Sequence, residues 1–135
     1  MESEEFCNRT GCIMTSVSSY RELIVWQKSM DLTVRIYALT RSFPAAERYG
    51  ITSQMRRSAS SIPANIAEGQ ARRSTGEFVQ SLGVARGSLA ELETFLTLSA
   101  RLEMTTPEQS KRLSEDCAEI NKMLNALIKS LTTPH

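Results

Sequence analysis

The sequence is poor in the side chains that acid–base catalysis commonly uses. Its single histidine, His135, is the last residue, and its only aspartates are Asp31 and Asp116. It has no glycine-rich phosphate-binding loop, and no triad of serine, histidine and acid can be assembled. Glu91 and Glu93 form the one carboxylate pair that we considered for acid–base catalysis or metal binding. Residues two apart on a helix, however, point about 200° away from each other. We therefore expect ion-pair roles for both glutamates and no enzymatic activity.

The cysteines are too few and too poorly arranged for a disulfide framework or a metal site. There are three, Cys7, Cys12 and Cys117, and an odd number favours a reducing cytoplasm. Cys7 and Cys12 resemble half of a zinc site, but no second Cys/His pair accompanies them. We expect no metal and no cofactor. Cys117 falls in the apolar row of the last predicted helix and is interpreted as a small core residue rather than a nucleophile.

Long apolar runs are also missing. The longest, such as Leu23 to Trp26, are far shorter than the roughly 20 residues that a membrane helix needs. The segment 1–19 starts acidic and lacks the basic and apolar regions of a secretory signal. We expect it to be a disordered leader, with Met14 as an alternative start of translation.

Aromatic residues make up only 6% of the chain, which favours helices over strands. Four segments have apolar residues at spacings of three and four: about 20–43, from 45 or 49 to 69, from 74 onward, and 106–131. They predict one domain at 20–131, an all-α, antiparallel up-down four-helix bundle with a short tail at 132–135. The predicted inner rows are Leu23, Trp26, Met30, Val34 and Tyr37, with Leu32, Ile36, Leu39 and Phe43 beside them; Ile51, Met55, Ala59, Ile62 and Ile66; Phe78, Leu82, Ala85, Leu89, Leu92 and Leu96; and Leu113, Cys117, Ile120, Leu124, Leu127 and Leu131.

Prolines, glycines and capping residues predict where these helices begin, bend and end. Pro63 lies inside the second helix and should bend it, leaving carbonyls that Ser58, Ser60 and Ser61 could satisfy. Gly69 is a plausible end of that helix. The third and fourth helices open on capping-box patterns, Ser74 with Glu77 and Thr106 with Gln109, the latter followed by Pro107.

Positive charge is concentrated in the middle of the chain. The net charge is only +1, yet residues 41–90 hold seven arginines against three glutamates. The planar fork of arginine suits phosphates, and it suits carboxylates equally well. The candidate phosphate-binding residues are Arg48, Arg56, Arg57, Arg72 and Arg73. The alternative is structural: Arg57 would pair with Glu68 or Glu91, and Arg72 and Arg73 would form a solvated loop.

Two further sets of residues predict contacts between helices or between subunits. Arg57, Ser61, Asn65 and Glu68 share one polar face of the second helix and could form a hydrogen-bonded network, with Glu91 as an ion-pair partner. On the third helix small residues recur, and each glycine there costs about 1 kcal/mol of helix propensity, so we expect a close backbone approach. This groove consists of Gly83, Gly87, Ala90 and Thr94.

Long stretches of the chain resemble a known family. "YRELIVWQKSMDLTVRIYALTRSFP", "SIPANIAEG" followed by "RRS", and "LAELET" are similar to the small bundle proteins whose reading frames lie in intervening sequences of bacterial 23S rRNA genes, over about 20–131. The resemblance implies a ring-like homopentamer. It also implies a more distant likeness in fold to the accessory variability proteins of diversity-generating retroelements, which bind nucleic acid and a reverse transcriptase.

Two functions follow as expectations. The first is a cytoplasmic, non-enzymatic homo-oligomer that binds RNA or DNA with little sequence specificity, multiplying weak arginine contacts around a ring. A nucleic-acid-processing protein is a further expected partner. The alternative is an interaction scaffold that docks an acidic protein. Of the two arginine pairs, Arg72 and Arg73 are the better functional candidates, and Arg56 and Arg57 are more readily explained as structural.

Overall fold

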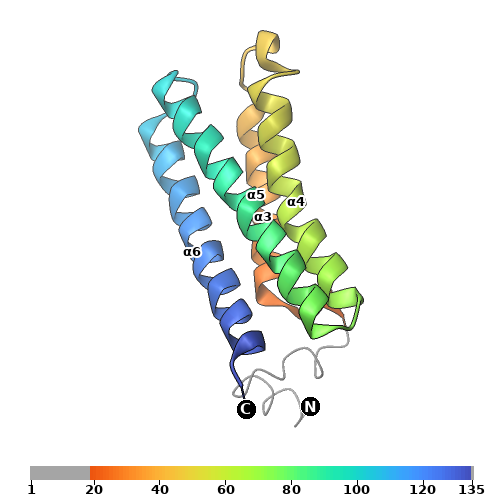
Figure 1. Ribbon diagram of the computed structural model, residues 1–135. Helices are drawn as coiled ribbons and strands as arrows, with labels where there is room; N and C mark the ends of the chain where they lie inside the picture. The colour runs from red at the N-terminus through yellow and green to blue at the C-terminus, as the bar shows by residue number, and fades with distance from the viewer. Residues whose placement is uncertain (1–18, 135) are drawn as a thin grey trace.

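The chain forms a bundle of four long helices in which consecutive helices run in opposite directions (Figure 1). A computed structural model describes residues 19–134. The predicted disordered leader therefore lies almost entirely outside the described residues. The elements are the 3-10 turn η1 (Tyr20–Glu22), α3 (Ile24–Thr40), the 3-10 turn η2 (Ala45–Glu47), α4 (Ile51–Ala71), α5 (Thr75–Arg101) and α6 (Pro107–Thr132). The all-α prediction is confirmed, and α6 ends at Thr132.

The helix starts follow their capping residues closely. Thr106 and Gln109 form the complete capping box, with Pro107 as the first helical residue. At α5 the Ser74 hydroxyl accepts the backbone N–H of Glu77. The Glu77 side chain does not complete the box and instead pairs with Arg72.

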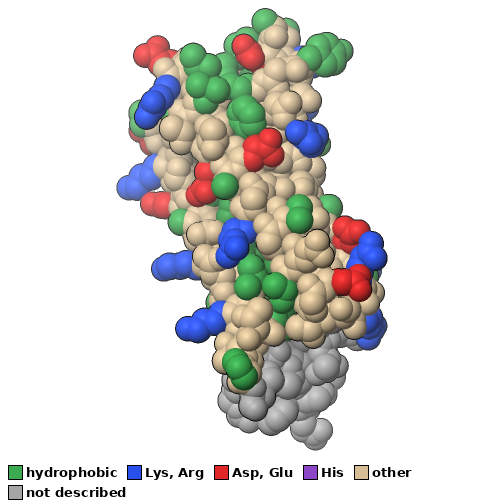
Figure 2. All heavy atoms as spheres, viewed as in Figure 1, with side chains coloured by type: hydrophobic (Ala, Val, Ile, Leu, Met, Phe, Trp, Pro, Cys, Tyr) green, Lys and Arg blue, Asp and Glu red, His purple; other side chains and the backbone are tan. Residues whose placement is uncertain are grey.

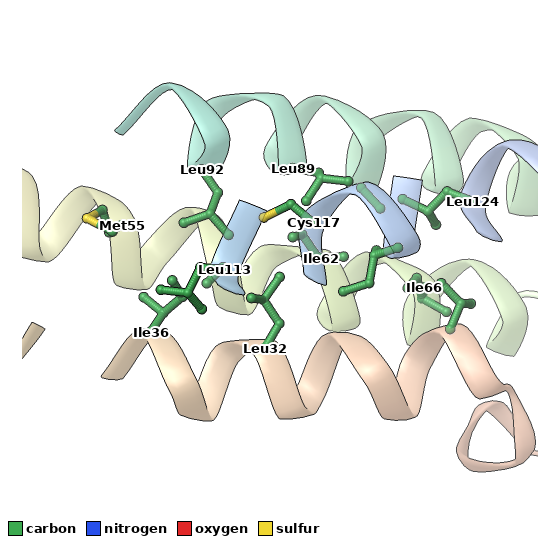
Figure 3. Close-up of a cluster of buried hydrophobic side chains, with 14 of the residues drawn as sticks. Leu32, Ile36, Met55, Ile62, Ile66, Leu89, Leu92, Leu113, Cys117 and Leu124 are labelled. Atoms are coloured by element: carbon green, nitrogen blue, oxygen red, sulfur yellow. The ribbon is translucent and has the colours of Figure 1, made fainter. Parts of the chain in front are cut away.

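The core consists of the predicted rows of α4, α5 and α6 and of one of the two rows predicted for the first helix. Side chains of all four helices meet along the bundle axis (Figure 3). In α3 the buried row runs through Leu32 and Ile36, whereas Met30, Val34 and Tyr37 are 40%, 64% and 41% exposed. Periodicity predicted both apolar rows of this helix, and the row of Leu32, Ile36, Leu39 and Phe43 is the one that lies in the core. Each fully buried leucine or isoleucine contributes roughly 1.5–3 kcal/mol to stability.

Helix α4 continues through Pro63 to Ala71, so the predicted bend stays a prediction. Pro63 has no N–H to give to the carbonyl of Ala59. The hydroxyl of Thr33 on α3 donates to that carbonyl at 3.1 Å. The prediction that neighbouring serines satisfy it was wrong: the Ser58 hydroxyl donates to Met55 and Ser60 to Arg57.

The sequence predicted that α4 ends at Gly69, but α4 continues to Ala71, and Gly69 lies at a close contact between α4 and α5. It is buried, and a Cβ placed on it would lie 2.6 Å from Cβ of Ser81 and 3.0 Å from Cδ1 of Phe78. Only a glycine fits this contact without a shift of α5. The α4–α5 pair is therefore joined tightly near its connection, the region that carries Arg72 and Arg73.

Candidate nucleic-acid interface

The five candidate arginines are spread along α4 rather than gathered in one patch. Arg48 precedes α4 and Arg73 follows it, and a helix of that length spans about 30 Å. Arg56 and Arg57 are adjacent residues on α4, so their side chains diverge by about 100°. A ligand touching both ends must therefore be extended, or must bridge several copies of the chain.

Arg56 ties α4 to α3. Its Nε donates to the Thr40 hydroxyl at 2.8 Å, and its guanidinium lies 4.7 Å from the ring centroid of Tyr37. Half-buried and stacked in this way, the side chain has a structural role.

Arg57 faces α5 on the other side of α4. It lies 3.9 Å from a carboxylate oxygen of Glu91 and donates to Gln54 at 3.1 Å. Of the two partners considered from sequence, the structure selects Glu91. With Arg57 70% exposed, such a pair contributes at most about 1 kcal/mol, and its guanidinium remains accessible.

Ser61 and Asn65 form the centre of a hydrogen-bonded network between α4 and α5. The hydroxyls of Ser61 and Ser88 are 2.8 Å apart, and Asn65 Nδ2 donates to the Ser61 carbonyl at 2.8 Å and to its hydroxyl at 3.0 Å. Within residues 19–134 no buried side-chain nitrogen or oxygen lacks a partner. Of the predicted network, Ser61 and Asn65 therefore belong to one cluster, which joins α4 to α5 through Ser88. Arg57 and Glu68 lie outside it and pair with Glu91 and Arg72. Ser88 was missed, although it recurs seven residues after Ser81 on the same face of α5.

Arg72 is held between two carboxylates. It lies 3.1 Å from Glu68 and 3.4 Å from Glu77. Its hydrogen bond to Glu68, together with the negative charges of Glu68 and Glu77, raises the pKa of the guanidinium above its usual value. Figure 2 shows side chains of both signs crowded over the α4–α5 connection, at the lower right. The charge of Arg72 is therefore largely balanced locally.

Arg48 and Arg73 are the candidates that no carboxylate of residues 19–134 neutralises. Both are exposed, and neither makes an ion pair or side-chain hydrogen bond within the part of the chain that the structure describes. Arg73 has a φ of 62°, a left-handed conformation that is uncommon for a residue other than glycine. Its backbone turns the chain from α4 into α5.

The other candidate sites, a hollow between α3 and α6, the thiol of Cys117 and possible metal ligands, do not include any of the five candidate arginines. A hollow of about 160 Å³ between α3 and α6 is lined by charged side chains that largely pair with one another, Lys28 with Glu119 and Arg35 with Asp116. Cys117 is buried, and burial, with the charges of Glu93 and Asp116, raises its thiol pKa to about 12. Among residues 19–134 no group of three or more potential metal ligands comes together. Cys7, Cys12 and His135 lie outside that range.

Nor does any helix of the described region have the length and apolar character to cross a membrane.

Gly83 and Gly87 lie on the outer side of α5, away from the Ser61 network. A Cβ added to either meets nothing within 4 Å.

Comparison with known proteins identifies the family. The family model described as "23S rRNA-intervening sequence protein" matches residues 21–126. The chain belongs to this family. A solved structure from Bacteroides thetaiotaomicron, described as a protein of unknown function from the S23 ribosomal protein family, is 34% identical, with a TM-score of 0.73. The match covers 78% of this chain and 96% of that one. A search of curated proteins finds no match.

Membership in the 23S rRNA-intervening sequence protein family confirms the resemblance read from "SIPANIAEG" and "LAELET". The more distant likeness to retroelement accessory variability proteins stays a prediction, as do the subunit number and the ligand.

Proposed function

We propose that this member of the family is a non-enzymatic homo-oligomer that binds RNA with little sequence specificity. The observation that carries the proposal is the pair of exposed arginines at opposite ends of α4, Arg48 and Arg73, with no carboxylate partner in the described region. Arg56, Arg57 and Arg72 are secondary contacts because each already has a partner within the chain. RNA is preferred over DNA because the names of the family and of the solved relative refer to 23S rRNA and to a ribosomal protein family.

Weak contacts become significant only when they are repeated. Arg48 and Arg73 of a single chain provide little affinity alone, but several copies holding one strand raise the effective concentration of every further contact. Each neutralised phosphate also adds to the salt dependence of binding. A cytoplasmic, reducing setting is part of the proposal, and the free thiol of Cys117 accords with it.

The proposal does not include catalysis. Glu91 pairs with Arg57, and Glu93 is exposed on a different side of α5. The high pKa of Cys117 keeps its thiol protonated near neutral pH, and a protonated thiol is a poor nucleophile.

The test is a titration of fluorescently labelled single-stranded RNA with the full-length protein at several salt concentrations. We expect log affinity to fall linearly with log salt, and Arg48→Ala/Arg73→Ala to weaken binding at least tenfold and to reduce the slope. A matched control, Lys122→Ala/Lys129→Ala, removes the same charge from exposed positions on α6 and should have a smaller effect. Salt-independent affinity, or equal effects of the two variants, would refute the arginine contacts.

The second candidate is a scaffold that docks an acidic protein. One observation favours it: the guanidinium of Arg72 already binds two carboxylates, Glu68 and Glu77, so this surface suits acidic side chains as well as phosphates. A partner that stays bound after nuclease treatment, combined with no RNA binding by the purified protein, would select the scaffold.

A further inference from the structure

The connection between α3 and α4 presents a tyrosine almost entirely to solvent. Tyr49 is 88% exposed, the largest value among the large hydrophobic side chains of residues 19–134. The other exposed or half-buried rings have partners: Tyr20 and Trp26 pack edge to face, and Tyr37 lies against an arginine. No ring or cation contact involves Tyr49 within those residues. In the part of the chain that the structure describes, its ring is therefore open to a ligand.

The backbone on both sides of Tyr49 is held in place. The N–H of Gly50 donates to the carbonyl of Glu47 at 3.0 Å, which closes a turn across the tyrosine. The side chains that anchor the connection at its two ends, Phe43 and Ile51, are buried. A side chain on such an ordered turn loses little further freedom when it binds a ligand. The ring is thus presented in a preorganised position.

The residue before Tyr49 adds a positive charge. Arg48 is exposed and forms no ion pair within the described residues. The acid next to it in sequence has another contact, because the carboxylate of Glu47 accepts the N–H of Ile51 at 3.5 Å. A side chain of the chain itself therefore caps the start of α4, and the anion-binding group offered here is the Arg48 guanidinium.

The rest of this end of the bundle is of mixed charge. The α3–α4 and α5–α6 connections both lie at the top of Figure 1. Arg41 follows α3 and Arg101 ends α5, and both are exposed. Glu103 and Glu108 lie near them in the α5–α6 connection and at the start of α6. Electrostatic attraction at this end is therefore modest, and a strand held here needs a second kind of contact.

An exposed aromatic ring beside an arginine provides the two contacts that single-stranded nucleic acids use. Bases stack on aromatic side chains whatever their sequence, and a guanidinium contacts the phosphates. The bases of a duplex are already stacked on one another, so the ring suits an unpaired base. An acidic peptide would use the arginine but would leave the ring without a partner.

We propose that Tyr49 stacks on an unpaired base of the RNA while Arg48 contacts an adjacent phosphate. This inference rests on the RNA binding of the proposed function and adds that the RNA is single-stranded where it meets this end of α4. Arg73, at the other end, has Arg72 and Ser74 as its neighbours in sequence. That end therefore offers a phosphate contact without a stacking ring.

Variants of Tyr49 separate stacking from charge in a titration of labelled single-stranded RNA at several salt concentrations. Tyr49→Ala should weaken binding at least about fivefold and leave the salt slope unchanged, because no phosphate contact is lost. Tyr49→Phe keeps the ring and should bind as the wild type does. Tyr49→Leu keeps an apolar side chain without a π face and should bind as weakly as Tyr49→Ala.

The position allows these changes without loss of the fold. Since Tyr49 is 88% exposed, all three variants should keep the circular dichroism and the unfolding transition of the wild type. Val84→Ala, which shortens a 51% exposed apolar side chain on α5, is the matched control and should leave the affinity unchanged.

An abasic strand of the same length tests the contact from the side of the RNA. It keeps the phosphates and lacks the bases, so the wild type should bind it at least about fivefold more weakly than the intact strand. Tyr49→Ala has no ring to lose a base from, so it should bind the two strands with nearly equal affinity.

The outcomes judge the inference and the proposed function separately. If the wild type binds RNA with the expected salt dependence but Tyr49→Ala binds as tightly, or still distinguishes intact from abasic strands as the wild type does, stacking on Tyr49 is wrong and the proposed function stands. If the wild type binds no RNA, and a protein partner is lost in Tyr49→Ala, the ring is a protein contact and both proposals are overturned.

Discussion

At the scale of single residues, Cys117 couples stability to pH. Its buried side chain sits among the core residues of α5 and α6, and burial raises the pKa of its thiol from 9.0 to about 12. In the unfolded chain the thiol ionises near its ordinary value. The folded state therefore holds a proton that the unfolded state loses between pH 9 and pH 12, and the stability that depends on it is lost as pH rises.

We predict that the advantage of the wild type over Cys117→Ala shrinks above pH 9. The difference in free energy of unfolding should fall by about 1 kcal/mol between pH 9 and pH 10 and stay nearly constant below pH 8. Urea unfolding of both proteins in reducing buffer at pH 7, 8, 9 and 10 measures it. Cys7 and Cys12 are present in both proteins, so their contributions to the difference in unfolding free energy cancel. A difference that stays constant up to pH 10 would refute the account of this thiol.

The sequence could predict which groups need a hydrogen-bond or ion-pair partner, but not always which residue provides it. Pro63 signalled an unpaired carbonyl at Ala59, yet the donor is Thr33, 26 residues away on another helix. A local pattern reveals only partners within one turn. Arg72 and Glu77, by contrast, are close in sequence. The sequence pattern assigned the Glu77 side chain to a capping box, whereas in the structure it pairs with Arg72.

At the scale of elements, periodicity predicted the helices well because each has a strong apolar row. It could not decide between the two rows of α3, since which stripe is covered depends on where the other helices lie. Gly69 was misread for a related reason: glycine both ends helices and permits close packing. Only the position of Ser81 on the neighbouring helix distinguishes these roles.

We predict that Gly69→Ala destabilises the protein although alanine favours helices. The added methyl group would clash with Ser81 and Phe78, and overpacking of this kind costs about 1–3 kcal/mol, more than the roughly 1 kcal/mol gained in propensity. The net loss of unfolding free energy should be up to about 2 kcal/mol in denaturant titrations.

Gly76→Ala is the matched control for this change. Nothing lies within 4 Å of its added Cβ, so stability should stay equal or rise slightly. Equal effects at Gly69 and Gly76 would contradict the close approach of α4 and α5.

At the scale of the whole molecule, the sequence predicted the bundle and the family but not the layout of the arginines. A +4 segment suggests one basic surface, whereas the folded chain separates Arg48 from Arg73 by the length of α4 and balances Arg72 with two glutamates. In the proposed function, binding of a polyanion would therefore depend on assembly, which would repeat Arg48 and Arg73 from copy to copy.

The central claim, an oligomer that holds RNA, is tested most directly by one measurement on protein purified at low salt without nuclease. Gel filtration with light scattering and absorbance at 260 and 280 nm gives the protein mass and the nucleic-acid content of the same particle. The account predicts a protein mass that is a multiple of the 15.1 kDa chain and an excess of 260 nm absorbance that ribonuclease or high salt removes. A 15.1 kDa particle free of nucleic acid would contradict it.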